Sequence, residues 1–239
     1  MADRIILIDK PLRWTSFDVV KKVRKPLLEE RRSELPENER RQLKNFKVGH
    51  AGTLDPLATG LLILCTGKMT KNISEIQSAE KEYTGTITIG STTESFDLEK
   101  EPENFLPFEH ITEQMVRELA VIFIGEQMQT APVHSAKKID GQRAYDKARR
   151  GDQFELKAHA VKISAFEITN FNLPDIGFKV ICSKGTYIRS LAFDFGKKLG
   201  TGGHLSALRR TRIGNFLIEN AQSPENFLLQ LSDKEQIRS

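Results

Sequence analysis

One carboxylate, Asp55, lies in a glycine-rich segment whose residue types suit the presentation of a reactive side chain. The segment runs from Gly49 to Leu62, has the sequence GHAGTLDPLATGLL and ends in an apolar run. Pro56 fixes its own φ angle and disfavours helical geometry at the residue before it, and glycines permit conformations that other residues rarely adopt. An Asp-Pro pair by itself is also an ordinary turn starter. The segment thus allows a turn-capping carboxylate or a nucleophile on a rigid loop beside a buried strand.

Further short motifs occur before and after this segment. In chain order they are Asp9-Lys10-Pro11, Lys81-Glu82-Tyr83, the run from Ser183 to Arg189 with the sequence SKGTYIR, and Leu208-Arg209-Arg210. Together with the Asp55 segment, they resemble the tRNA pseudouridine synthases of the TruB type. The resemblance extends from about residue 5 to about residue 214, which is most of the chain.

The resemblance implies both a fold and a reaction. The fold is α+β, with a mixed, mainly antiparallel central sheet flanked by helices and loops, known as the pseudouridine synthase fold. The reaction converts a flipped-out uridine of the TΨC loop of tRNA, at position 55 of the tRNA, to pseudouridine. The N-glycosidic bond breaks, the base rotates and it rejoins through C5, so the reaction is redox-neutral. No metal-ligand cluster, dinucleotide fingerprint or phosphate loop stands in the sequence, and we expect neither a cofactor nor a metal.

Three residues are implied as catalytic. Asp55 attacks the target nucleotide, and whether it attacks C1′ or C6 is left open. The guanidinium of Arg189 pairs with Asp55, because its planar fork can hold a carboxylate's charge and orientation. Tyr83 stacks on the base and could assist proton removal from C5. Taken alone, Arg189 could be a solvent-exposed arginine at a helix start, and Tyr83 a strand residue with its hydroxyl at the surface.

Substrate binding is implied for His50, Tyr187 and Leu208, in addition to Tyr83. Tyr187 and Leu208 would enclose the base and ribose, and His50 would contact the RNA where the target nucleotide leaves the stack. We expect His50 at an exposed position on a glycine-flanked loop. By themselves, a lone histidine is more often structural and Leu208 would be a core residue.

The segment from Thr130 to Gly151 is basic and contains an aromatic residue, Tyr145. It resembles the thumb loop that grips the RNA stem-loop, and the anionic RNA backbone would attract its charges. An ordinary amphipathic helix after a loop is the alternative. The expected RNA-binding residues are Lys137, Lys138, Arg143, Arg149 and Arg150, with Lys147 among them.

Other segments bear on the domain organisation. Residues 25–47 carry both signs of charge and few apolar residues, which predicts an exposed charged arm rather than core. Residues 91–100 depart from the family's pattern, so we expect altered loop geometry there. The stretch after Asn215 is too short for the RNA-binding PUA domain of many relatives, which predicts one catalytic domain over residues 1–239.

The elements that must position these residues follow from periodicity. Continuous apolar runs and period-two alternation predict strands over residues 61–65, 84–89, 161–168 and 178–182. Apolar residues at helical spacing behind capping residues predict helices from Thr15 or Ser16 to Val23, from Thr112 to Phe123, and from Tyr187 to Leu199.

Composition sets outer bounds on the function. The chain has 239 residues, 36 Lys and Arg, 32 Asp and Glu, and a net charge of +4, so affinity for RNA must come from clusters. Cys65 and Cys182 lie in apolar segments, which favours core packing in a reducing cytoplasm. The N-terminal apolar run is far too short for a membrane segment. We expect tRNA as partner, no membrane association and no obligate protein partner.

Two other functions remain open. An RNA-binding or tRNA-folding protein with little or no catalysis would not need Asp55, Tyr83 and Arg189 together. A glycoside hydrolase would need a second carboxylic acid near Asp55, and none has a comparable signature around it.

Overall fold

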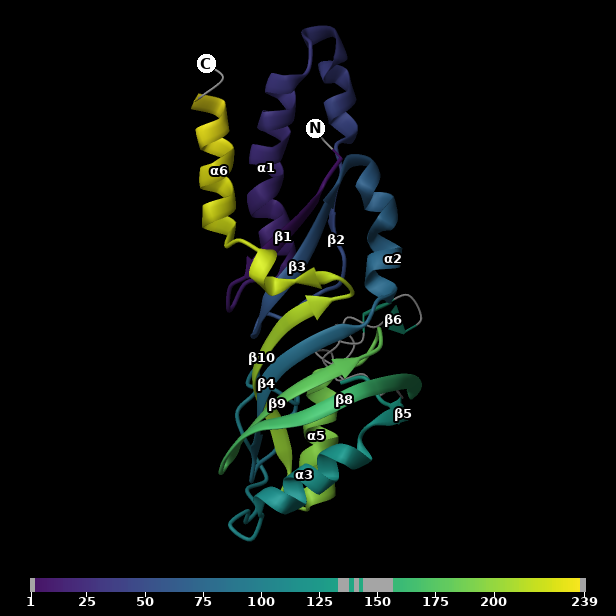
Figure 1. Ribbon diagram of the computed structural model, residues 1–239, viewed down its shortest axis with the longest axis vertical. Helices are drawn as coiled ribbons and strands as arrows, with labels where there is room; N and C mark the ends of the chain where they lie inside the picture. The colour runs from purple at the N-terminus through teal and green to yellow at the C-terminus, as the bar shows by residue number, and fades with distance from the viewer. Residues whose placement is uncertain (1–2, 133–137, 140–141, 144–156, 237–239) are drawn as a thin grey trace. The chain divides into compact units, whose positions relative to one another are not determined.

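The computed structural model describes residues 3–132, 138–139, 142–143 and 157–236 (Figure 1). The chain divides into two compact units. The first unit comprises Met1–Lys81 and Arg209–Ser239, and the second comprises Glu82–Leu208. The predicted single catalytic domain over residues 1–239 stays a prediction.

The first unit is built on a sheet in which β3 is the central strand. β3 pairs antiparallel with β1 and with β2, and it neighbours β10, which in turn pairs antiparallel with β11. The strands are β1 (Ile5–Lys10), β2 (Val48–His50), β3 (Ala58–Thr66), the part of β10 (Gly203–Ile213) from residue 209 onward, and β11 (Phe216–Leu217).

Both faces of β3 are buried, which explains why its sequence is apolar throughout. Leu62 and Leu64 belong to one hydrophobic cluster, and Leu61, Ile63 and Cys65 belong to another. Because successive strand side chains alternate between faces, each cluster covers one side of the sheet. The helices of this unit are α1 (Ser16–Glu34), η1 (Glu37–Asn45), η2 (Gly67–Asn72), α2 (Ile73–Ser78), η3 (Ile218–Asn220) and α6 (Pro224–Gln236).

Helix α1 extends further than its sequence predicts. It continues through Pro26 to Glu34, and the side chains of Leu27 and Glu30 are buried. Leu27 joins the same cluster as Val23, one helical turn earlier. Part of the segment 25–47 is therefore core, because the apolar stripe of α1 does not stop at the proline.

The second unit contains the remaining strands in the order β10, β4, β9, β8, β5. β9 pairs antiparallel with β8, which pairs antiparallel with β5. The elements are β4 (Lys81–Ile89), β5 (Gly125–Gln129), β8 (His159–Asn172), β9 (Asp175–Cys182), and the helices α3 (Glu113–Ile122) and α5 (Ile188–Leu199).

Phenylalanine side chains join the helices of the second unit to its sheet. The ring of Phe195 on α5 lies 5.6 Å from that of Phe123, the residue that ends α3, and 5.5 Å from that of Phe166 on β8. Phe166 also contacts Phe178 on β9, with 5.9 Å between ring centres. All four side chains are buried. The predicted α+β fold with a mixed, mainly antiparallel sheet is confirmed.

Of the basic segment 130–151, residues 130–132, 138–139 and 142–143 are described. There β6 (Lys138–Ile139) pairs antiparallel with β7 (Gln142–Arg143), which sets Lys138 opposite Arg143. Lys137, Arg149 and Arg150 lie outside the described residues. The thumb loop stays a prediction.

Candidate active site

Asp55 lies in the loop that joins β2 to β3, and it is half-buried. The backbone N–H of Ala58 donates to the carbonyl oxygen of Asp55 at 3.1 Å, which closes a turn with Pro56 at its second position. Helix α1 fixes the preceding residue, because Ser16 Oγ accepts from the Leu54 N–H at 2.8 Å and donates to the Leu54 carbonyl at 3.2 Å. Asp55 therefore stands on a loop with little backbone freedom.

A buried arginine, Arg210 of β10, holds the other side of this loop. Its Nη2 donates to the carbonyl oxygen of Gly52 at 3.1 Å, and its Nη1 donates to that of Thr53 at 3.4 Å. Its Nε donates to the carbonyl of Leu61 on β3 at 2.8 Å. Only 1% of Arg210 is exposed, so these carbonyl groups satisfy a charged group that has lost its water.

A second buried cation, Lys10 at the end of β1, lies under the same loop. Its Nζ donates to the carbonyl oxygens of Trp14 at 2.6 Å, Pro11 at 2.9 Å and Pro56 at 3.5 Å. Burial lowers the pKa of Lys10 from 10.5 to about 8, and the negative charge of Asp55 acts in the opposite direction. The attraction is mutual, so Lys10 favours the ionised form of Asp55, which a nucleophilic carboxylate requires.

The sequence predicted no chemical role for Lys10 or Arg210. Each stands in a short family motif, yet a lysine or arginine in a strand is usually read as a solvated residue. The available signal was the position of Lys10, directly after the apolar run Ile5–Ile8 and before Pro11. A charge at the end of a buried strand needs partners, and here the partners are backbone carbonyl groups of the loops.

His50 occupies a different setting from the exposed loop predicted for it. It is the last residue of β2, paired with Leu64 of β3, and it is half-buried. Burial lowers the pKa of His50, the backbone of Gly52 acts to raise it, and the nearby charge of Arg210 lowers it further. The strand pairing with β3 extends to this residue, which explains the difference.

In the second unit, Arg189 lies in the first turn of α5 and is 5% exposed. Its Nη1 forms an ion pair with Asp97 Oδ2 at 3.5 Å and donates to the carbonyl oxygen of Ser95 at 3.4 Å. The alternative of a solvent-exposed arginine is thus wrong. Buried ion pairs hold a guanidinium in a fixed orientation when hydrogen bonds accompany them.

The loop that carries Asp97 is tightly organised. Thr93 Oγ1 and Ser95 Oγ both donate to the Asp97 carbonyl oxygen, at 2.7 and 3.0 Å. Phe96 adopts a φ of 63° and its ring stacks on Phe193 of α5 at 4.1 Å. Asp97 was missed in the sequence. Its signal was the alternation of small hydroxyl residues at 91, 93 and 95, all of which are buried.

The remaining predicted site residues of the second unit lie on three elements. Tyr83 lies on β4 and is buried. Its burial argues against the alternative of a strand residue with its hydroxyl at the surface. Leu208 is half-buried on β10. Tyr187 directly precedes α5, and the buried Gln129 of β5 clamps its backbone: the amide oxygen accepts from the Tyr187 N–H at 2.7 Å, and the amide nitrogen donates to its carbonyl at 3.0 Å.

The predicted site residues thus fall into two sets. Asp55 and His50 belong to the first unit, and Tyr83, Tyr187, Arg189 and Leu208 belong to the second. The pairing of Asp55 with Arg189 stays a prediction. Within the described part of the chain, no group of three or more His, Cys, Asp or Glu residues is placed to hold a metal ion. None of the described helices is long and apolar enough to cross a membrane.

The fold is similar to that of solved protein structures, one of which contains a substrate RNA. A solved structure described as an H/ACA RNP bound to a substrate RNA containing 2′-deoxyuridine aligns with a TM-score of 0.68 and 25% sequence identity. The alignment covers 98% of this chain and 55% of that chain, so this chain spans about half of its length. The fold is that of the pseudouridine synthases.

The particular family follows from sequence comparison. Residues 40–188 match the model of the TruB family pseudouridylate synthase N-terminal domain, and residues 189–236 match that of the tRNA pseudouridylate synthase B C-terminal domain. The tRNA pseudouridine synthase B of Flavobacterium johnsoniae is 52% identical over 221 residues, 92% of this chain and 93% of the relative. That of Phocaeicola vulgatus is 49% identical over 231 residues, 97% of this chain and 94% of the relative. The chain belongs to the TruB family, and its enzyme class is tRNA pseudouridine synthase.

Proposed function

We propose that this chain converts the uridine at position 55 of tRNA, in the TΨC loop, to pseudouridine, with Asp55 as the nucleophile. The main support for the proposal is the way in which hydrogen bonds hold the loop that carries Asp55. Its loop is fixed by hydrogen bonds from Ser16, Lys10 and Arg210, while Asp55 as a residue is only half-buried. A rigid, reachable carboxylate beside a buried cation is suited to attack on a base that has been flipped out of its stack.

The reaction needs a nucleophile, a closed pocket and one proton acceptor. Asp55 adds to the nucleotide and is released again at the end of the reaction. The C1′–N1 bond breaks, the base rotates while it is retained, the C1′–C5 bond forms, the proton on C5 leaves and N1 takes up a proton, so the product is an isomer of the substrate. We propose that Tyr83 stacks on the base and assists this proton removal, and that Arg189 orients Asp55. Tyr187 and Leu208 would enclose the base and ribose. The clamp of Gln129 on Tyr187 and the ion pair of Asp97 with Arg189 support these positioning roles.

RNA contacts beyond the reacting nucleotide complete the proposal. His50 would fill the space that the uridine vacates, and its lowered pKa favours the neutral imidazole near pH 7. The basic thumb segment would grip the phosphate backbone of the stem-loop through Lys137, Lys138, Arg143, Arg149 and Arg150. As part of the same proposal, the enzyme acts on tRNA in the cytoplasm.

The proposal is tested by mapping the modified position. A tRNA transcript carrying tritium at uridine C5 is incubated with the chain, tritium release is measured, and the pseudouridine is located. We expect release from one uridine, in the TΨC loop, and none from a transcript in which that uridine is replaced by cytidine. Release from other uridines with the substituted transcript would contradict the position proposed here.

The alternative is an RNA-binding or tRNA-folding protein with little or no catalysis. It predicts tight binding of the same transcript with no tritium release. The buried position of Arg189 beside Asp97 favours the enzyme, because a protein that only binds RNA gains little from a desolvated guanidinium in an ion pair.

A further inference from the structure

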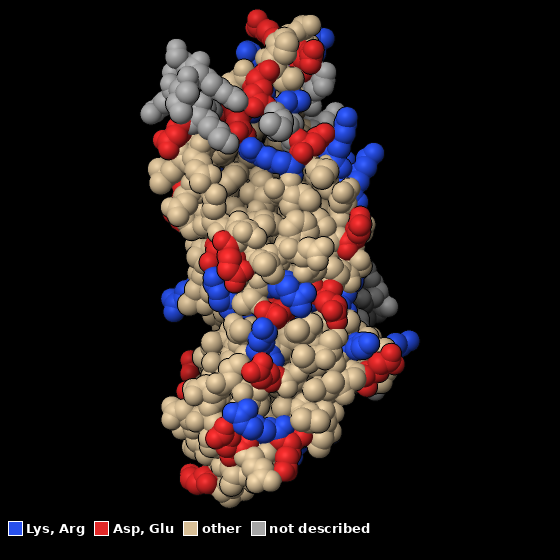
Figure 2. Space-filling view, viewed as in Figure 1, with Lys and Arg blue, Asp and Glu red and all other residues tan. Residues whose placement is uncertain are grey.

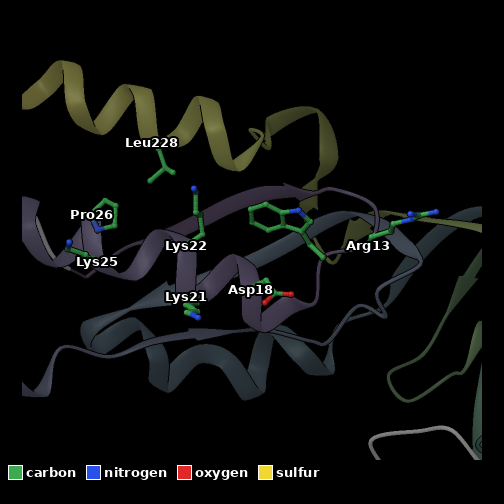
Figure 3. Close-up of a pocket in the computed structure, with 8 residues that line it drawn as sticks. Arg13, Asp18, Lys21, Lys22, Lys25, Pro26 and Leu228 are labelled. Atoms are coloured by element: carbon green, nitrogen blue, oxygen red, sulfur yellow. The ribbon is translucent and has the colours of Figure 1, made fainter. Parts of the chain in front are cut away.

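A groove outside the proposed catalytic residues lies between α1 and α6 of the first unit. It has a volume of about 710 Å³ and is open to solvent along one side. Figure 3 shows Lys22 rising from α1 toward Leu228 of α6, with Pro26 and Lys25 at one end and Arg13 at the other. Its lining residues are Arg13, Trp14, Asp18, Lys21, Lys22, Lys25, Pro26 and Leu228.

The groove is positively charged. Four of its eight lining residues are lysine or arginine, and the one acid, Asp18, accepts hydrogen bonds from the backbone and hydroxyl of Thr15 in the cap of α1. Among the described residues, Lys22 has no ion pair, Lys21 is attracted by Asp18 one helical turn away, and Lys25 has only an exposed ion pair with Glu29 at 3.8 Å. Exposed pairs of this kind contribute little, so the groove keeps cations available for an anionic ligand.

Arg13 is held in a conformation that favours glycine. Its φ is 67°, and its N–H donates to the carbonyl oxygen of Pro56 at 2.7 Å, next to Asp55. A residue with a side chain is strained in this region, whereas glycine is not. Arg13 is exposed, and glycine at this position would adopt the same backbone conformation with less strain. The presence of arginine in place of glycine therefore indicates a function for the guanidinium.

The charges are arranged along a line that leads away from the Asp55 loop. Lys22 and Lys25 are three residues apart on α1, which sets them on one face about 5 Å apart along the axis. From Ser16, which bonds to the Asp55 loop through Leu54, to Lys25 the helix rises about 14 Å. Between the cations, Trp14, Pro26 and Leu228 provide apolar surface that suits ribose and base faces.

We propose that this groove binds the phosphate backbone of a tRNA segment outside the TΨC stem-loop. This inference rests on the proposed function, because it takes the same tRNA as its ligand. The groove extends along α1 from Arg13, whose N–H donates to the Pro56 carbonyl, and none of its lining residues is among the proposed catalytic residues. Two lysines at this spacing would neutralise two phosphates and release their counterions.

The test compares binding of a full-length tRNA transcript with binding of the isolated TΨC stem-loop. The groove variant is Lys22→Gln with Lys25→Gln. The matched control is Arg24→Gln with Lys68→Gln, which removes two exposed charges of the same unit that do not line the groove. We expect the groove variant to bind full-length tRNA at least about threefold more weakly, with a slope of log affinity against log salt shallower by about 2. Its binding of the stem-loop should match that of the control.

Arg13→Gly provides a second variant that does not endanger folding. Glycine relieves the backbone strain, so this variant should unfold at the same or a higher temperature, yet bind full-length tRNA more weakly. The inference would be overturned if the groove variant lost as much affinity for the stem-loop as for full-length tRNA, or if the charge control lost as much affinity for full-length tRNA as the groove variant. Unchanged binding of full-length tRNA by the groove variant would also overturn it, and an acidic protein partner would then be the remaining ligand for the groove. Tritium release by the unaltered chain tests the proposed function separately.

Discussion

Lys10 and Arg210 are charged residues in β-strands, where the alternating pattern predicts side chains that are either apolar and buried or polar and exposed to solvent. Both are fully buried, and both direct their donors to backbone carbonyl groups of loops near Asp55. Asp55 itself, Tyr83 and Arg189 could be singled out from the sequence by motif. The partners that hold them could not, because a hydrogen bond from Arg210 to Gly52 joins residues far apart in the chain and depends on the fold.

Removal of the Lys10 charge should change how stability depends on pH. Because burial lowers the pKa of Lys10 to about 8, the unfolded chain binds more protons than the folded chain between about pH 8 and 10.5. The stability contributed by this group therefore rises with pH across that window and is lost as pH falls through 8. Relative to Lys10→Met, the natural chain should gain up to about 3 kcal/mol in free energy of unfolding between pH 7 and pH 10.5.

Urea unfolding of both proteins near pH 7 and near pH 10 measures this difference. Other lysines are common to the two proteins and cancel in the comparison. A difference in unfolding free energy that stays constant with pH would show that Lys10 titrates normally in the folded chain.

Asp97 is predicted to be a positioning residue that acts through Arg189. Asp97→Asn keeps the shape of the side chain but removes the charge that pairs with the guanidinium 3.5 Å away. We expect kcat for tritium release to fall by about 10²-fold, with KM nearly unchanged, because small misplacements of a catalytic group are costly. Steady-state kinetics with tRNA measure both constants.

Glu94→Gln is the control for Asp97, since Glu94 is an exposed carboxylate of the same loop that pairs with Lys100. It should leave kcat unaltered. If Asp97→Asn and Glu94→Gln behaved alike, the buried ion pair would have no part in catalysis.

At the scale of elements, periodicity and caps predicted much of the fold. The expected strand at residues 61–65 is β3, and the helices behind Thr112 and Tyr187 are α3 and α5. Thr112 accepts a hydrogen bond from Met115, and Gly200 ends α5 with a φ of 79°. These signals are local, so a sequence carries them without knowledge of the fold.

Helix α1 and strand β10 show why other elements could not be predicted. The helix behind Thr15 or Ser16 was predicted to end at Val23, and Pro26 beyond it lacks the N–H that an interior helical bond needs. Burial of Leu27 in the core overrides that cost, and the helix continues. The strand β10 lacks an apolar pattern because some of its buried positions hold His204 and Arg210, whose partners come from distant segments.

The close approach of β3 and β10 predicts unequal effects of two glycine substitutions. An added Cβ at Gly60 would lie 2.3 Å from the backbone carbonyl oxygen of Arg210, whereas at Gly52 the nearest atom is 3.5 Å away. Both glycines have similar φ angles, 100° and 104°, so the backbone strain of alanine is matched. Gly60→Ala should therefore lose more unfolding free energy than Gly52→Ala, whose cost is about 1–3 kcal/mol.

Thermal or urea unfolding of the two alanine variants gives the comparison directly. Equal destabilisation would mean that β10 can move away from β3 without cost. In that case Arg210 would not be a fixed support for the loop that carries Asp55.

At the scale of the whole molecule, the net charge is too small to explain affinity for RNA. The chain has a net charge of only +4, and Figure 2 shows acidic and basic side chains interspersed over the visible face. Affinity for RNA must then come from local clusters, of which the groove along α1 is the described example. Family membership settles the enzyme class, while the position of the target uridine and the nucleophile rest on the proposal.

Asp55→Asn shows whether the Asp55 carboxylate is the nucleophile. Tritium release from tRNA labelled at uridine C5 is measured for the natural chain and the variant, together with the affinity of each for the same tRNA. We expect tritium release by the natural chain, none by Asp55→Asn, and nearly equal binding of tRNA by both. Release by the variant at the natural rate, or a loss of binding as large as the loss of release, would contradict the assignment of Asp55 as the nucleophile.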